Sequence, residues 1–235
     1  KAIEHFEALA RLNPEDVENE LVLGRLYRLN NQGEKAEQVF RKVLESHPDS
    51  KSALTHLAQL FFDQGDYEQA IELLTKLDAE DMDAQVFSML AYAYSQTQDF
   101  DNAIAHYEKA LRLDPENVEI RRSYADALMS GGRLAVARQE FEELLKADPE
   151  DGPTCLRLAQ LDRQEGRFEE ARKGLERARA LMPEGLEVAF QQVVLEDLLG
   201  NQDQAISILE GLIRQSERPA EQYTAGEATN RAIFL

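Results

Sequence analysis

The chain has 235 residues, of which 43% are hydrophobic, and its 26 Lys and Arg stand against 45 Asp and Glu for a net charge of −19. This acidity opposes direct binding to nucleic acid phosphates or to anionic lipid, because like charges repel. The hydrophobic fraction is large enough to bury a substantial core, so the sequence predicts a folded chain.

Most of the prolines recur at a fixed interval. The recurring residues are Pro14, Pro48, Pro115, Pro149 and Pro183, with separations of 34, 67, 34 and 34 residues. Between them apolar residues recur at steps of three and four, interrupted by turn signals at Gly65-Asp66, Gly131-Gly132, Gly166 and Gly200-Asn201. Each interval therefore predicts two helices. A single pair of short helices cannot cover its apolar faces, so the sequence predicts an all-α solenoid of stacked hairpins.

In chain order we expect residues 1–16 to be the second helix of a truncated repeat. Full repeats follow at 17–50, 51–83, 84–117, 118–151, 152–185 and 186–219, and then a connector and the start of a further helix at 220–235. The 51–83 repeat has 33 residues and Met82 in the proline position, which predicts an unusual exit turn. Asp162 occupies a position where the repeat pattern has tyrosine. The 186–219 repeat is divergent, with Gln192 and Glu196 in usually apolar positions, so we expect its first helix to pack less well.

The first full repeat resembles the tetratricopeptide family, whose pattern is W-x2-L-G-x2-Y, then A-x3-F, then P. The matching residues are Leu23, Gly24, Tyr27, Ala36, Phe40 and Pro48. The resemblance implies a right-handed superhelix of antiparallel helix-turn-helix hairpins. Because both ends hold incomplete repeats, we expect a fragment of a longer array, and a bacterial one. The residues that carry the pattern are interpreted as packing residues.

Residues suited to catalysis or metal binding are scattered. No pair among His5, His47, His56 and His106 has the spacing that places two ligands on one helical face, so we expect no metal site. Cys155, the only cysteine, excludes an intrachain disulfide and is expected to be a buried structural thiol. Gly131 and Gly132 lack the residues of a phosphate loop. We therefore expect no enzyme and no cofactor.

The resemblance places the first helix of each hairpin on a concave groove that meets the ligand. Arginines there can bond carboxylates in bidentate fashion, and aromatic rings beside amides suit an extended peptide or a glycan. The predicted ligand-binding residues are Arg25, Gln59, Phe62, Gln85, Ser88, Tyr92, Arg122, Asp126, Gln160 and Arg163.

These residues predict a scaffold that binds an extended segment of a protein partner in the groove, centred on the repeats at 84–117 and 118–151. One alternative is a module of a bacterial envelope assembly or exopolysaccharide export system, which could guide a cationic polysaccharide. Another is the regulatory array of a larger enzyme. Self-association through the array ends is also expected to be possible. No window approaches the roughly 18 apolar residues of a membrane span, and the compartment stays open between cytoplasm and bacterial periplasm.

Overall fold

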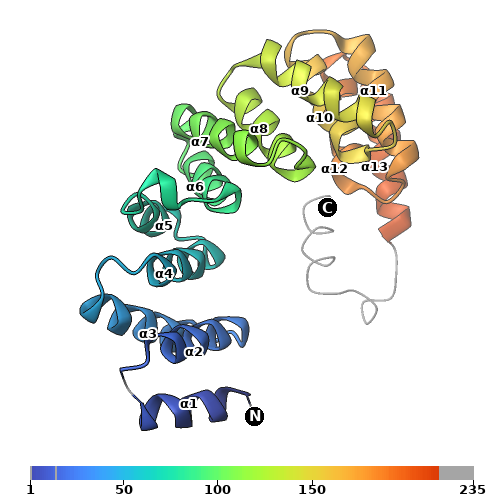
Figure 1. Cartoon of the computed structure of the whole chain (residues 1–235). Helices are drawn as coiled ribbons and strands as arrows, with labels where there is room; N and C mark the ends of the chain where they lie inside the picture. Colours follow the sequence, from blue (N-terminus) through green and yellow to red (C-terminus); the bar gives the residue numbers. More distant parts are fainter. Residues whose placement is uncertain (1, 14, 217–235) are drawn as a thin grey trace. The chain divides into compact units, whose positions relative to one another are not determined.

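A computed structural model describes residues 2–13 and 15–216 of the chain (Figure 1). Within these ranges all regular structure is helical, which confirms the all-α hairpin fold. The chain divides into two compact units, Lys1–Gly132 and Arg133–Leu235, which are treated separately. The boundary falls inside the range 118–151 that the sequence predicts as one repeat. Pro14 and the predicted connector at 220–235 lie outside the described residues.

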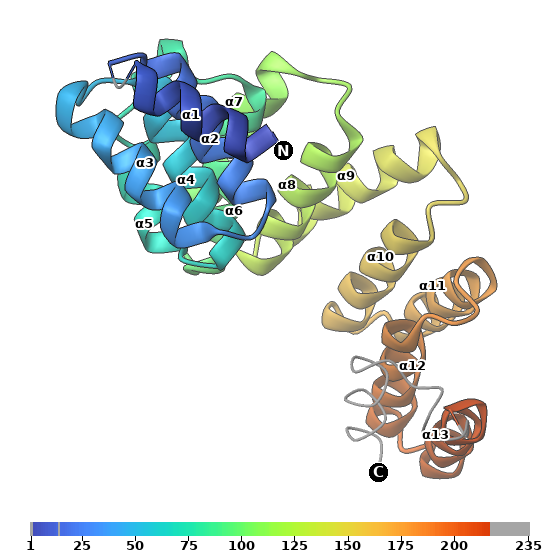
Figure 2. The same ribbon diagram turned by 90° about the horizontal axis from the view of Figure 1, so that it is seen from below.

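The first unit is a succession of helical hairpins. Its helices are α1 (Ala2–Leu12), α2 (Val17–Leu29), α3 (Gly33–Ser46), α4 (Lys51–Gln64), α5 (Tyr67–Leu74), η1 (Ala79–Asp81), α6 (Ala84–Gln96), α7 (Phe100–Leu113) and α8 (Val118–Ser130). The pairs α2–α3, α4–α5 and α6–α7 pack closely, and α2, α4, α6 and α8 also contact one another in sequence. Figure 2 shows α3 and α5 at the left edge of this unit, with α4 and α6 beside them. The helices α2, α4, α6 and α8 therefore form one continuous row. We call the surface of this row the first-helix face.

The second unit repeats this arrangement. Its helices are α9 (Leu134–Ala147), α10 (Gly152–Gln164), α11 (Phe168–Leu181), α12 (Leu186–Leu198) and α13 (Gln202–Ser216). The pairs α10–α11 and α12–α13 pack as hairpins, and α10 contacts α12. Its core includes Cys155, Leu175 and Leu195, each almost completely buried.

Five of the first helices, α2, α4, α6, α8 and α10, begin at equivalent places because a short polar side chain caps each of them. Asp16, Ser50, Asp83, Asn117 and Asp151 each accept a hydrogen bond from the backbone N–H three residues later, at 3.2, 3.4, 2.8, 3.1 and 3.1 Å. Such caps satisfy N–H groups that have no partner inside the helix. The five helices α2, α4, α6, α8 and α10 thus start at the same point of the repeat, so equivalent residues occupy equivalent positions on each.

The turn inside each hairpin needs one residue with positive φ. These residues are Asn31 (56°), Gly65 (80°), Gln98 (63°), Gly132 (74°), Gly166 (75°) and Gly200 (78°). Glycine adopts this left-handed conformation without steric cost, whereas glutamine does not. The backbone therefore shows the repeat even at positions 31 and 98, where the sequence holds no glycine.

Close helix crossings require small residues. A Cβ added at Gly24 would lie 2.5 Å from Cε1 of Phe40, and one added at Gly174 would lie 2.8 Å from the Cβ of Ala159. Phe40 is completely buried between these helices. These glycines fix how closely the two helices of their hairpins approach.

Glu196, one of the two polar residues expected to weaken the packing of α12, is buried and pairs with an arginine of the preceding hairpin. Glu196 is 4% exposed and accepts hydrogen bonds from Arg172 Nε at 3.0 Å and Nη2 at 3.2 Å. One repeat earlier, Asp162 is 6% exposed and accepts from Arg138 Nη2 at 2.6 Å. The same buried ion pair thus occurs in two successive repeats of the second unit.

The predicted unusual exit turn of the 33-residue repeat corresponds to a short second helix. Helix α5 ends at Leu74, and the 3-10 helix η1 follows it at Ala79–Asp81. Lys51 of α4 pairs with Asp81 and so ties η1 to the same hairpin. This repeat keeps its place in the stack with a second helix of 8 residues, where α3 and α7 have 14.

Candidate functional site

The predicted ligand residues lie on the first helices of both units. Eight belong to the first unit: Arg25 on α2, Gln59 and Phe62 on α4, Gln85, Ser88 and Tyr92 on α6, and Arg122 and Asp126 on α8. Gln160 and Arg163 lie on α10 of the second unit and are described with that unit. Arg25, Gln85 and Tyr92 are exposed, and the other seven residues are partly buried.

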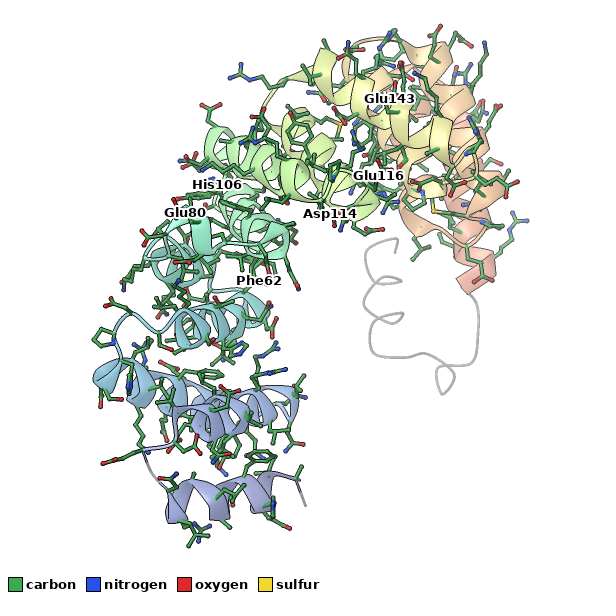
Figure 3. The ribbon with its side chains drawn as sticks, in the orientation of Figure 1. Phe62, Glu80, His106, Asp114, Glu116 and Glu143 are labelled. Carbon is green, nitrogen blue, oxygen red and sulfur yellow. The ribbon has the colours of Figure 1, made fainter. Side chains whose placement is uncertain are left out.

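An aromatic cluster forms the middle of the first-helix face. The ring centroid of Phe62 lies 5.3 Å from that of Tyr92 and 5.7 Å from that of Tyr67, and the two tyrosine rings are 6.0 Å apart. Figure 3 labels Phe62 on α4. Tyr92 is 39% exposed, and burial followed by its hydrogen bond with Tyr67 raises its pKa. Tyr67 was not among the predicted ligand-binding residues. It is the first residue of α5, directly after the capping residue Asp66, and that position is the sequence feature that could have identified it.

Two arginines of α2, Arg25 and Arg28, lie near His56 of α4 and supply positive charge to this part of the face. Arg28 pairs with Asp63, which also accepts a hydrogen bond from Gln59 Nε2 at 2.8 Å. Burial lowers the pKa of His56, and the guanidinium groups of Arg25 and Arg28 lower it further. His56 is therefore uncharged at neutral pH, and the two arginines supply the positive charge of this part of the face.

The α8 part of the face is held by polar contacts. Arg122 Nη1 donates to both carboxylate oxygens of Glu119, each at 2.8 Å. Tyr107 of α7 is buried beneath it, and burial raises its pKa while hydrogen bonds with Ser123 and Ser95 oppose that rise. The hydrogen bond between Tyr107 and Ser123 joins α7 to α8, and so supports the polar surface on α8.

In the second unit, a chain of hydrogen bonds joins α10 to α12. Arg157 Nη1 donates to Gln160 Oε1 at 2.9 Å, and Gln160 Nε2 donates to Glu187 Oε1 at 3.2 Å. Gln191 Nε2 donates to the same oxygen at 2.9 Å. The Nε of Arg163 is buried without a hydrogen-bond partner among the described residues. This hydrogen-bonded chain lies beside Phe190 of α12, which is 44% exposed.

Other features bear on chemistry and location. Burial raises the pKa of the Cys155 thiol, which disfavours the nucleophilic thiolate. The described residues contain no group of three or more His, Cys, Asp or Glu arranged to hold a metal ion. Over the same residues, every helix is too short or too polar to span a membrane. An open pocket of about 550 Å³ lies between α3, α4 and α5, and it was not predicted from the sequence. Leu44, Leu54, Leu57 and Leu73 are among the residues that line it.

Three family models match the chain. One described as "Cytochrome c-type biogenesis protein H TPR domain" matches residues 8–109, and two described as "Tetratricopeptide repeat" match residues 88–152 and 130–190. Together they extend from residue 8 to residue 190, so most of the chain matches tetratricopeptide models.

Curated relatives are similar in sequence. The chain is 28% identical over 180 residues to TPR repeat-containing protein YpiA of Bacillus subtilis, covering 74% of this chain and 41% of that protein. It is 27% identical over 218 residues to Cellulose synthase operon protein C of Pseudomonas fluorescens, covering 89% of this chain and 17% of that protein. The chain therefore spans less than half the length of either relative.

Among solved structures, the fold resembles YrrB, described as "a TPR protein with an unusual peptide-binding site". The TM-score is 0.72 at 19% identity, over 81% of this chain and 98% of that one. This likeness concerns the fold alone. Taken with the family models, it shows that the chain belongs to the tetratricopeptide repeat proteins.

Proposed function

We propose that this chain is a protein-interaction module that holds an extended segment of a partner protein on the first-helix face. The bound segment would be centred on α6 and α8. One observation carries the proposal: Tyr92 exposes 39% of its surface on this face while Phe62 and Tyr67 hold its ring in place. A ring fixed in this way offers contact area at little entropic cost, which suits recognition.

Polar residues around the ring would orient the bound segment. Gln59, Gln85 and Asp126 are suited to hydrogen bonds with a peptide backbone, and Arg25 and Arg122 to contacts with acidic groups. In the second unit, Gln160 and Arg163 remain proposed ligand residues of α10. The proposal assigns no catalytic step to this segment.

The experiment compares two double variants in affinity capture of partners from a lysate. Tyr92→Ala with Arg122→Ala removes the ring and the guanidinium from the face. Leu113→Ala with Arg112→Ala is the matched control, because it makes the same kinds of change at exposed positions of α7. We expect the first variant to lose the partners that the wild type and the control retain, with thermal melts alike. Equal capture by both variants would refute the assignment to this face.

A second candidate function is a module of an envelope system that handles polysaccharide. It is favoured by the similarity to Cellulose synthase operon protein C, which extends over 89% of this chain. The net charge of −19 would attract a cationic polymer. Binding to chitosan oligomers that weakens as salt is raised, with no binding to uncharged cellulose oligomers, would support this function. Absence of binding to either would count against it.

A further inference from the structure

Arg25 differs from Arg28 and Arg122 on the first-helix face because no acidic group among the described residues pairs with it. Arg28 pairs with Asp63 and Arg122 pairs with Glu119. Arg25 is exposed and has neither an ion pair nor a hydrogen bond with the described residues. Its guanidinium is available to a carboxylate from outside.

Arg25 lies in line with the exposed aromatic ring. Arg25, Gln59 and Tyr92 occupy the equivalent position of three successive repeats, on α2, α4 and α6, separated by 34 and 33 residues. Consecutive members of this helix row contact each other. The row therefore presents a cation, an amide and an aromatic ring in that order.

The middle member is suited to a peptide backbone. Gln59 Nε2 donates to Asp63, which fixes the orientation of the amide and leaves its carbonyl oxygen Oε1 to accept an N–H group. At the far end, Phe62 and Tyr67 pack against Tyr92 and limit the rotation of its ring. Gln59 and Tyr92 are thus partly preorganised for an extended chain crossing the helices, whereas the Arg25 side chain is free to reach its partner.

We infer that the partner segment carries an acidic side chain that pairs with Arg25 and, further along, an aromatic or large aliphatic side chain that packs on Tyr92. Neighbouring helices lie about 8–10 Å apart and an extended chain advances about 3.3 Å per residue, so the two side chains are about five or six residues apart. The segment is internal, and the acid is a Glu or Asp side chain. This inference rests on the proposed function and specifies the part of the bound segment that crosses α2 and α4 before it reaches Tyr92 on α6.

The test is selection from a displayed library of random peptides of about twelve residues, long enough to cross this face. Against the wild type, enriched peptides should carry Glu or Asp at the stated spacing from an aromatic or large aliphatic residue. Arg25→Ala should weaken their binding about tenfold or more, as measured by fluorescence anisotropy, because a charge-assisted hydrogen bond is lost. Selection against Arg25→Glu should replace the acid by Lys or Arg. The control Arg112→Glu on α7 should change neither result.

The outcomes separate this inference from the function beneath it. Suppose that the enriched peptides lack acidic residues, bind Tyr92→Ala more weakly than the wild type and bind Arg25→Ala equally well. That result would overturn the inference and leave the proposed function standing. Peptides that bind only while their own C-terminal carboxylate is free, and fail when amidated, would overturn the assignment to an internal acidic side chain. No enrichment, or enriched peptides indifferent to every change on this face, would overturn both.

Discussion

The buried ion pair between Arg172 and Glu196 can be tested against an apolar pair from the same chain. Glu196 is held by both Arg172 and Asn201, whose Nδ2 donates to Glu196 Oε2 at 2.7 Å. Two repeat lengths earlier, the positions equivalent to Arg172 and Glu196 hold Ile104 and Leu128. The double variant Arg172→Ile with Glu196→Leu therefore installs a combination that the fold already uses.

The two single variants should differ because the two partners are buried to different extents. Arg172→Ile leaves the Glu196 carboxylate buried with only Asn201, and should cost about 3–5 kcal/mol of unfolding free energy. Glu196→Leu leaves an arginine whose side chain is 31% exposed and which also bonds Glu169 at 3.2 Å. That arginine can turn toward water, so the loss should be about 1 kcal/mol. The double variant should lie within about 1 kcal/mol of the wild type, far from the sum of the singles.

The assay is urea unfolding at neutral pH, followed by circular dichroism, with hydrogen exchange of the α11 and α12 amides as a local measure. Lys173→Ile, at an exposed neighbouring position on α11, is the control for adding an apolar side chain to that helix. A double variant as unstable as the sum of its singles would show that the pair is not coupled, and would refute this account of how α12 packs.

Three further results are expected. Gln98→Gly should stabilise the chain by about 0.5–1 kcal/mol in denaturant unfolding, because it relieves a glutamine in the left-handed conformation. Gly65→Gln should destabilise the chain by a similar amount, although nothing crowds an added Cβ there. Equal stability of the two variants would contradict the strain argument. Gly24→Ala should cost about 1–3 kcal/mol in the same assay because the new Cβ would overlap the ring of Phe40, and a neutral result would mean that the helices separate freely. Burial opposes ionisation of Glu196, but hydrogen bonds from its partners lower its pKa overall, so its stabilising effect holds above the ordinary glutamate pKa of 4.5 and is lost below it. Glu196→Gln should thus be less stable than the wild type at neutral pH and approach it as the pH falls, whereas a gap that stays constant with pH would disprove the linkage.

The helices could be predicted because their signals are local. Prolines, capping residues such as Asp16 and Asn117, and apolar steps of three and four each act within one helix or one turn, so the sequence places them directly. The turns at Asn31 and Gln98 were harder to find because neither holds a glycine. There the repeat length is the better guide, since it fixes the turn even where the residue type does not.

The contacts on the first-helix face could not be predicted because they depend on which neighbour a side chain meets. Arg25 and Arg28 look alike in the sequence, yet Asp63 on α4, the first helix of the following hairpin, pairs with only Arg28. Tyr67 joins the aromatic cluster from a second helix, outside the positions that the repeat assigns to ligands. The pairing of Asp162 likewise depends on the register between two hairpins.

The recurrence of the arginine–carboxylate pair makes one stretch of the chain compatible with copies of itself. A 34-residue segment that contains both Asp162 and Arg172 brings a carboxylate for the hairpin before it and an arginine for the hairpin after it. If that segment were duplicated in tandem, the arginine of the first copy would meet the carboxylate of the second, and no buried charge would be left over. Joining a segment of the first unit to one of the second lacks this property, since placing Ile104 against Asp162 would bury an acid against an aliphatic side chain. The array can therefore lengthen by unequal recombination more readily in its second unit than across the two units.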